Sequence, residues 1–304
     1  MINLFKKIKS VINKRYLRTP GVEYLIKNMN NEKIKRDHIN FWLNCSRKNK
    51  NFKKIFFTQN EKADNELSFD IKNQELELND EMLNSLAYNG LIIFKNILPN
   101  DERNEIIEYF NELKINRSIK KKWEKGPIVT NAFNAAHEMF GLTSIKNFKT
   151  LDSISKKFSK EIYGKIVEPT VEFRYLKMGE KFESEKTKGN TFIHTDRFLP
   201  HFKIFYTPFE ITEYDAPLQY LLSSHKINDQ YIKFFTNTKT FDETDEMFKK
   251  FKFKKKIVLV PSNSLYVAFT NGFHKRSQFK AKTERSMVFL QYVENFNKID
   301  YLIS

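Results

Sequence analysis

Residues 264–290 read SLYVAFTNGFHKRSQFKAKTERSMVFL, and this stretch gives the clearest indication of the fold class. Two short runs rich in Leu, Val, Phe and Tyr flank the turn residues Asn271-Gly272 and a basic segment. Apolar runs of about four to eight residues bounded by turn residues are typical of β-strands. Similar runs recur along the second half of the chain, at 171–178, 191–198, 202–210, 217–223, 256–261, 264–270 and 284–293. This spacing predicts a β-sandwich or β-barrel.

The preceding part of the chain has a helical pattern. Asn79 or Asp80 is placed to cap a helix that ends at Asn89-Gly90, where a glycine favours termination. A short apolar strand, Leu91–Phe94, comes next, and a second amphipathic helix follows Pro99. Two more helices are predicted, around Ala132–Phe140 and around Ile154–Ile162. Helices followed by many short strands predict an α+β fold.

Composition narrows the class of protein. The chain has 304 residues and a net charge of +16, with 53 Lys and Arg against 37 Asp and Glu. Cys45 is the single cysteine, so no internal disulfide forms and we expect a cytoplasmic location. No apolar stretch approaches the roughly 18 residues that span a bilayer. A Gly-rich phosphate loop and βαβ alternation are also missing, which argues against nucleotide-binding folds.

The positive charge favours anionic partners. The lysines are spread along the chain and no nucleic-acid-binding motif occurs, so nucleic acid is a disfavoured partner. In residues 1–19 apolar side chains recur at helical spacing and every charged residue is basic. This pattern is typical of a helix lying on the inner, anionic face of a membrane, and also of a helix packed on its own domain, which we favour.

We divide the chain into a basic, partly helical extension, 1–75, and a main domain, 76–304. The main domain contains an insertion at about 226–256, where acidic residues are followed by lysines. This segment is interpreted either as a lid near a site or as a solvated helix.

Histidine and carboxylate residues in the β-rich half predict a metal site. His194-Thr195-Asp196 stands at a strand end, where residues two apart point to the same side. Both side chains can therefore bind one metal ion, and His274, after the Asn271-Gly272 turn, is the best third ligand. Two histidines and one carboxylate with open positions opposite are typical of non-haem Fe(II) oxygenases, although zinc accepts the same ligands.

Arg285 lies 11 residues after His274 and opens the apolar run 286–290. Its guanidinium is predicted to point into a β-lined cavity, where burial requires a carboxylate partner. The planar fork of arginine binds a carboxylate through two parallel hydrogen bonds. A dicarboxylate that chelates iron at one end and contacts Arg285 at the other satisfies both requirements. The alternative is an ordinary surface arginine.

Three motifs in this order resemble the phytanoyl-CoA dioxygenase-like family of Fe(II)- and 2-oxoglutarate-dependent oxygenases. They are His194-Thr195-Asp196, the stretch DAPLQYLLSSHK at 215–226, and the stretch from His274 to Val288. Residues 80–113 resemble the opening of the family's domain, so the resemblance covers about 80–295. It implies a double-stranded β-helix, a jelly-roll or cupin-like barrel, flanked by N-terminal helices.

Carried over to this chain, the resemblance implies Fe(II) bound by His194, Asp196 and His274. Arg285 would bind the distal carboxylate of 2-oxoglutarate, with Tyr175 as a second co-substrate contact and O2 as the oxidant. His225 matches a family histidine that is not a ligand, and we interpret it as structural.

The chain departs from the family at several positions. Ala216 and Ser223 replace glycines, Arg276 stands where a small hydroxyl residue is usual, and Phe205 where Trp is usual. Arg276 and Phe205 are therefore candidate substrate contacts, and Arg276 suggests an anionic substrate.

The favoured function is a dioxygenase that hydroxylates a small or carrier-linked molecule. A catalytically silent jelly-roll binding protein, associated with a membrane surface through residues 1–19, is the main alternative, followed by a basic nucleic-acid binder. The sequence indicates neither the substrate nor an oligomeric state. The oxygenase hypothesis predicts that the three metal ligands and Arg285 converge at one barrel mouth.

Overall fold

The computed structural model describes most of the predicted main domain and part of the extension. It covers residues 50–56, 67–71, 75–115, 136–142, 145–164, 166–178, 193–196, 202–227, 240–241, 252–277 and 283–292. The amphipathic segment 1–19 and most of the 226–256 insertion lie outside the described residues.

Helices precede and interrupt the strands, as the sequence predicts. They are α4 (Lys50–Phe56), α5 (Asp80–Asn89), α6 (Asn100–Ile115), the 3-10 helix η2 (Ile145–Asn147) and α8 (Lys149–Tyr163). The predicted ends of α5 are confirmed. The Asn79 side chain accepts a hydrogen bond from the Met82 N–H, and Gly90 ends the helix with φ 75°. Within the part of the chain that the structure describes, no helix has the length and apolar character needed to cross a membrane.

The strands form two sheets. In spatial order the seven-stranded sheet contains β1 (Ser68–Asp70), β2 (Leu91–Lys95), β10 (Ser264–Ala268), β6 (Lys203–Thr207), β12 (Glu284–Gln291), β4 (Thr170–Met178) and β3 (Ala136–Leu142). The five-stranded sheet contains β8 (Thr240–Phe241), β5 (Ile193–His194), β11 (His274–Arg276), β7 (Leu218–Leu221) and β9 (Lys255–Ile257). All pairings are antiparallel except that of β1 with β2.

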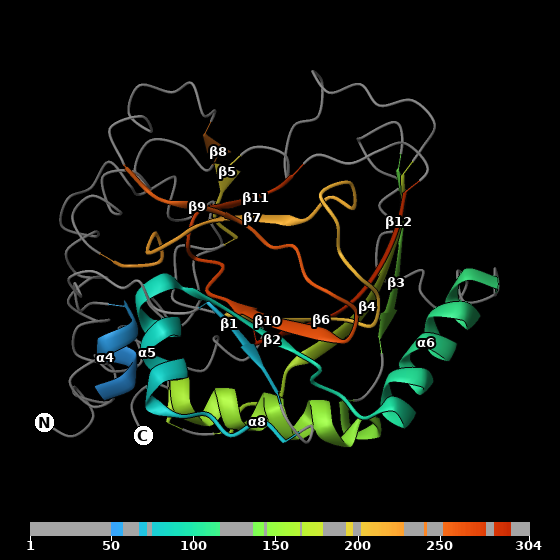
Figure 1. Cartoon of the computed structure of the whole chain (residues 1–304), viewed down its shortest axis with the longest axis horizontal. Helices are drawn as coiled ribbons and strands as arrows, with labels where there is room; N and C mark the ends of the chain where they lie inside the picture. Colours follow the sequence, from blue (N-terminus) through green and yellow to red (C-terminus); the bar gives the residue numbers. More distant parts are fainter. Residues whose placement is uncertain are drawn as a thin grey trace, which may run out of the picture.

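The seven-stranded sheet is covered differently on its two faces. The helices α5 and α8 lie against one face, and the five-stranded sheet lies on the other side (Figure 1). We call these the helix face and the cavity face. Strand alternation separates them, because in β12 Val288 and Leu290 belong to the helix-face core whereas Met287 and Phe289 belong to the cavity-face core. The separation follows directly from the two-residue period of a strand.

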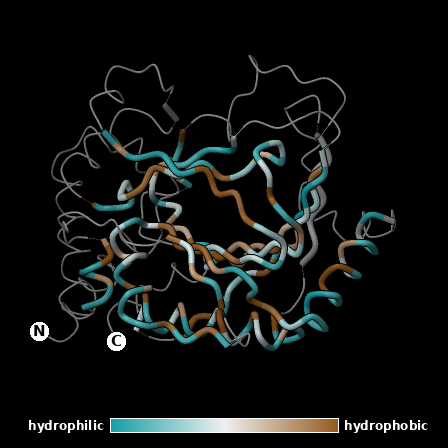
Figure 2. The backbone as a smooth tube through the Cα atoms, viewed as in Figure 1, coloured by the Kyte–Doolittle hydropathy of each residue, from teal (hydrophilic) through white to brown (hydrophobic). Residues whose placement is uncertain are grey.

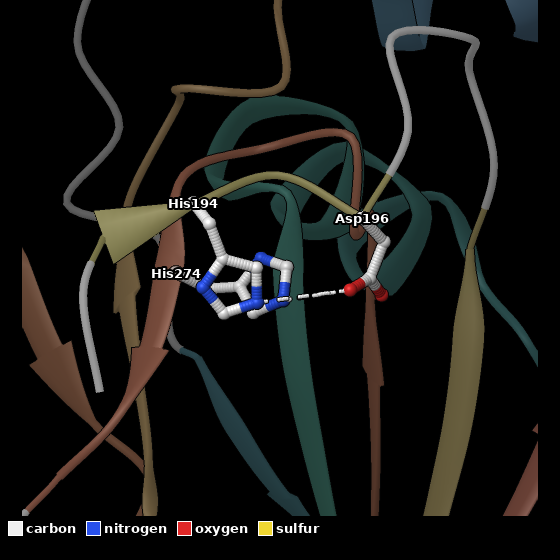
Figure 3. A group of neighbouring side chains, drawn as sticks. All are labelled: His194, Asp196 and His274. Carbon is white, nitrogen blue, oxygen red and sulfur yellow. Dashed lines mark ion pairs between the residues drawn. The ribbon is translucent and has the colours of Figure 1, made fainter. Parts of the chain in front are cut away.

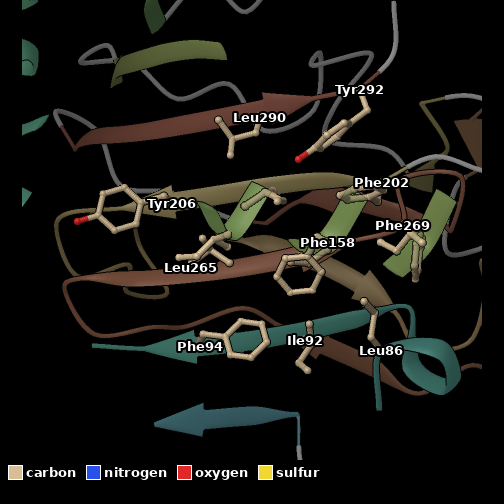
Figure 4. Packing of buried hydrophobic residues seen from close by; sticks show 14 of the residues in the cluster. Leu86, Ile92, Phe94, Phe158, Phe202, Tyr206, Leu265, Phe269, Leu290 and Tyr292 are labelled. Carbon is tan, nitrogen blue, oxygen red and sulfur yellow. The ribbon is translucent and has the colours of Figure 1, made fainter. Parts of the chain in front are cut away.

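The helix face holds the larger apolar cluster. Aromatic rings pack against one another there (Figure 4). The ring centroids of Phe94 and Phe158 lie 5.8 Å apart, and those of the stacked pair Phe202 and Tyr292 lie 4.3 Å apart. The helix α8 alternates hydrophobic and hydrophilic residues along its length (Figure 2), and its apolar positions are those buried against the sheet. The extension also contributes to this core, since Phe52 and Phe56 of α4 are fully buried in it.

One predicted element is wrong. The segment around Ala132–Phe140, predicted as a helix, contains the strand β3 from Ala136 onward. β3 pairs with β4 from Ala136 opposite Met178 to Leu142 opposite Glu172. Ala, His, Glu and Met are compatible with a helix, but the hydrogen-bonding edge of β4 outweighs that weak local preference. The short strands β1, β8 and β11 were not predicted, because none of them carries a continuous apolar run.

Candidate metal centre

An open cavity lies between the two sheets, and the empty space within it and its solvent-filled mouth together is about 550 Å³. The described residues lining it come from both sheets and from the segments next to them. They are Arg174, His194, Asp196, Lys203, Phe205, Ala216, Leu218, Tyr266, His274, Lys275, Arg276, Arg285, Met287 and Phe289. Every candidate residue from the sequence lines this cavity except Tyr175. The structure therefore brings His194, Asp196, His274, Arg285, Arg276 and Phe205 to one place.

The two histidines are neighbours because their strands are. His274 of β11 pairs directly opposite His194 of β5 in antiparallel register, so both side chains leave the same face of the five-stranded sheet. Their ring centroids lie 4.5 Å apart. Figure 3 shows the two imidazoles side by side, both facing the Asp196 carboxylate.

Asp196 follows the end of β5. Its backbone N–H donates to the Thr270 carbonyl at 2.9 Å, which ties the His-Thr-Asp segment to the end of β10. Its Oδ1 lies 3.8 Å from His194 Nε2 and 3.5 Å from His274 Nε2. One donor atom from each of the three residues lies within 4.8 Å of the other two.

The turn before β11 fixes the orientation of His274. Its Nδ1 lies 2.9 Å from the Gly272 carbonyl, which only accepts hydrogen bonds, so Nδ1 is the donor there and Nε2 is the ring nitrogen that faces Asp196. Ser224 braces the same turn, since its hydroxyl accepts from the Phe273 N–H at 2.7 Å. Gly272 is required there, because a Cβ at this position would clash with the Tyr220 hydroxyl.

These donors fit a divalent transition metal. Two imidazole nitrogens and one carboxylate oxygen converge on the cavity, and this is the ligand set of non-haem Fe(II) sites, which leaves several coordination positions for small molecules. His274 is buried and the other two ligands are partly exposed at the cavity wall.

Arg285 reaches across the cavity from β12. Its Nη1 donates to the carbonyl of Ala216 and lies 3.5 Å from the carbonyl of Asp215. The neighbouring Tyr266 is fully buried; burial raises the pKa of its phenol, and the positive charge of Arg285 opposes that shift. Tyr266 therefore stays neutral, and its hydroxyl donates to the Met287 sulfur at 3.4 Å.

Arg276 and Phe205 line the cavity from opposite sheets. Arg276 is two residues after His274 on β11, opposite Leu218 of β7. Phe205 of β6 stacks on Tyr266 at 4.7 Å and meets the ring of Phe289 edge-on at 4.9 Å. These three rings form an aromatic wall on the cavity face.

Tyr175 points the other way. Its ring belongs to the helix-face core and lies under the Lys114 ammonium of α6, 5.1 Å from the ring centroid. Since alternate residues of a strand face opposite sides, it is the adjacent residue, Arg174, that lines the cavity.

Sequence reasoning missed three basic residues of the cavity, Arg174, Lys203 and Lys275. Lys203 of β6 places its Nζ 2.6 Å from Asp196 Oδ2. Arg174 of β4 pairs with Glu172 at 2.6 Å and stacks over the Phe289 ring at 4.2 Å. The available signal was strand alternation, because Arg174 and Lys203 share the cavity-face positions of apolar strands.

His225, Ala216 and Ser223 are explained by the local structure around them. His225 is fully buried, stacks on Phe269 at 5.1 Å and contacts the Ala87 carbonyl through Nε2 at 3.1 Å, in agreement with its interpretation as structural. Ala216 has φ 53° and Ser223 has φ 66°. Both residues adopt the left-handed conformation that glycine tolerates best.

No protein-family model matches the chain, and no curated protein sequence matches it. Among solved structures the chain is similar to EctD from S. alaskensis in its apo form, with 13% identity over 69% of this chain and 75% of EctD and a TM-score of 0.47. It is also similar to the non-haem α-ketoglutarate-dependent carbocyclase SnoK of nogalamycin biosynthesis, with 12% identity, 71% and 83% coverage and a TM-score of 0.46.

HygX from Streptomyces hygroscopicus, solved with nickel and 2-oxoglutarate bound, is 13% identical, with 71% and 87% coverage and a TM-score of 0.39. At these levels of similarity the interpretation of the cavity rests on its own residues and geometry.

Proposed function

We propose that this protein is an Fe(II)- and 2-oxoglutarate-dependent dioxygenase that hydroxylates a small or carrier-linked organic substrate. The observation that carries the proposal is the convergence of His194, Asp196 and His274, with donor atoms within 4.8 Å of one another, in a cavity also lined by Arg285. The two facing sheets are then the halves of a double-stranded β-helix, of the phytanoyl-CoA dioxygenase-like type that the sequence motifs suggest.

Each residue has a distinct role in this proposal. The two Nε2 atoms and one Asp196 oxygen hold Fe(II), and Arg285 holds the distal carboxylate of 2-oxoglutarate in its planar fork. When bound there, Fe(II) allows O2 and 2-oxoglutarate to oxidise a C–H bond, with the hydroxylated product, succinate and CO2 released. The aromatic wall of Phe205, Tyr266 and Phe289 excludes water from the substrate side of the cavity.

The first test measures co-substrate binding without any substrate. Protein loaded with Fe(II) under anaerobic conditions and then mixed with 2-oxoglutarate is expected to develop the visible absorption of an Fe(II)–2-oxoglutarate chelate. On admission of O2 it is expected to release succinate slowly. His194→Ala removes one metal ligand, so both signals are expected to disappear.

The matched control is Tyr175→Phe, which changes a side chain on the opposite face of β4. This variant is expected to retain both the absorption and the succinate release. A wild-type protein that binds the metal but neither develops the absorption nor consumes 2-oxoglutarate would contradict the proposal and favour a catalytically silent binding protein.

A further inference from the structure

The described residues that line the cavity include far more basic than acidic side chains. Among its described lining residues Arg174, Lys203, Lys275, Arg276 and Arg285 are basic, and Asp196 is the one carboxylate. Lys203 is paired with Asp196 and Arg174 with Glu172, each at 2.6 Å. In the proposed function the charge of Fe(II) is balanced by the two charges of 2-oxoglutarate. The summed charge of the described lining residues therefore stays positive after metal and co-substrate are accounted for.

Arg276 is one of these basic residues and lines the cavity near the metal ligand His274. It is on the same strand face as His274, about 7 Å further along β11 at the usual rise per residue. It is only partly exposed, and it lines the cavity from the five-stranded sheet. A guanidinium in such a wall favours an oxyanion, which it binds through two hydrogen bonds.

The cavity also provides an apolar surface opposite Arg276. The rings of Phe205, Tyr266 and Phe289 lie on the seven-stranded sheet and line the cavity. An organic molecule with an apolar body and an oxyanion group can contact the aromatic wall and Arg276 together. This arrangement places the body of the molecule beside the metal ligands.

We propose that the substrate is an organic anion, with a phosphate, phosphonate or carboxylate group bound by Arg276. This inference rests on the proposed function and specifies the substrate class of the same cavity. In this proposal Arg285 binds 2-oxoglutarate and Arg276 binds the substrate. Substitution of one arginine therefore weakens the binding of one molecule and not of the other.

The test uses Zn(II)-loaded protein saturated with 2-oxoglutarate, and calorimetry with three probes. Phenyl phosphate and phenylacetate carry the two kinds of oxyanion, and benzyl alcohol is the neutral counterpart. Both anions are expected to bind at least about tenfold more tightly than the alcohol, and the tighter of the two identifies the group. Arg276→Met is expected to abolish this preference while the Kd for 2-oxoglutarate changes by less than about twofold.

The exposed Lys252 provides a charge-matched control, and Lys252→Met is expected to leave all four affinities unchanged. Equal binding of alcohol and anions would overturn the inference. So would an Arg276→Met variant that loses 2-oxoglutarate and keeps the probes. Failure of the proposed function gives a different result, because the wild-type protein would then not bind 2-oxoglutarate at all.

A second inference concerns Lys203 and rests on a different observation. The two oxygens of Asp196 face different partners: Oδ1 faces both histidine Nε2 atoms, and Oδ2 lies 2.6 Å from Lys203 Nζ. We infer that Lys203 is a positioning residue that occupies Oδ2, so that Asp196 offers the metal a single oxygen. A carboxylate held in this way leaves more coordination positions open for 2-oxoglutarate and O2.

This role is testable with Co(II), whose visible spectrum reports coordination number. In Lys203→Met the carboxylate is free to bind through both oxygens, so the spectrum is expected to change. The Kd for 2-oxoglutarate is expected to rise about tenfold while Co(II) still binds. Lys203→Arg keeps a donor to Oδ2 and is expected to restore both properties. If Lys203 only supports the fold, Lys203→Met leaves the spectrum and the 2-oxoglutarate affinity unchanged, and the inference fails.

Discussion

The two faces of the seven-stranded sheet are built from the same strands but differ in composition. The helix face is a closed apolar layer in which residues such as Phe173 and Leu290 are fully buried. On the cavity face, Arg174, Lys203 and Arg285 line the cavity together with Phe205, Tyr266 and Phe289. Adjacent residues of one strand therefore serve different purposes: one packs in the apolar core, and the next lines the cavity. A cavity lined by charges is tolerated because the other face supplies the buried apolar area.

The largest expected effect is on the helix face. Phe173 is fully buried against Tyr109, Phe110 and Phe148, with ring centroids 4.4, 5.2 and 5.5 Å away. Phe173→Ala is therefore expected to reduce the free energy of unfolding by about 3–5 kcal/mol, measured by urea denaturation. Phe289→Leu, on the cavity face, is the control and is expected to cost less than about 1.5 kcal/mol. Equal losses at the two positions would remove the distinction between the faces.

The next prediction concerns Arg285, which lies on the cavity face of the sheet. Arg285→Met removes the guanidinium from the cavity, so the Kd for 2-oxoglutarate is expected to rise about tenfold to a hundredfold. The free energy of unfolding is expected to change by less than about 1 kcal/mol, because the side chain is only partly buried. Arg285→Lys retains the charge without the planar fork and is expected to recover the affinity only in part. A large loss of stability with unchanged 2-oxoglutarate affinity would assign Arg285 to the fold.

His225 is a titratable residue buried against the apolar core of the helix face. Burial, and next the charge of Lys226, lower the pKa of its imidazole well below the usual value, so the ring is neutral in the folded protein. Below about pH 6.5 the unfolded chain takes up the proton that the folded protein excludes. Stability is therefore fully present above that pH and is lost as the pH falls, by at most about 1.4 kcal/mol per pH unit for one proton.

The measurement compares urea midpoints at about pH 7.5 and about pH 5.5 in the wild type and in His225→Gln. Glutamine does not titrate, so the variant is expected to show a smaller pH dependence even if it is less stable at both values. Identical pH dependence in the two proteins would mean that His225 does not contribute.

The smallest expected effect is at the backbone of the cavity rim. Ala216 has φ 53°, a conformation that is strained for alanine, so Ala216→Gly is expected to stabilise the protein by about 0.5 kcal/mol. The matched control is Ala87→Gly in α5, where the same change is expected to destabilise by about 1 kcal/mol. Thermal unfolding of the two variants is expected to shift in opposite directions, and a shift in the same direction would contradict this explanation.

Sequence patterns predicted the elements whose signals are local. The caps of α5, the amphipathic α8 and the apolar strands β10 and β12 all follow from residue spacing within one segment. β3 and β11 could not be predicted in this way. They are strands because their neighbours offer hydrogen-bonding edges, and such pairing is invisible within the segment itself.

The candidate site was predicted unevenly for the same reason. His194 and Asp196 are joined by local spacing, whereas Arg174 and Lys203 gave no motif and were recognised only from the cavity that they line. Tyr175 was a candidate from the sequence but does not line the cavity. Its position on a strand next to the site did not indicate which face of the sheet its side chain occupies.

Residue patterns were sufficient to identify apolar strands such as β10 and β12 and the side chains able to bind a metal, because periodicity and ligand chemistry are properties of short segments. The pairing of His274 with His194 and the contact between Lys203 and Oδ2 of Asp196 are visible only in the folded chain. Those contacts depend on the register between strands distant in the chain, and a register is set by backbone pairing and by the packing of both sheet faces at once.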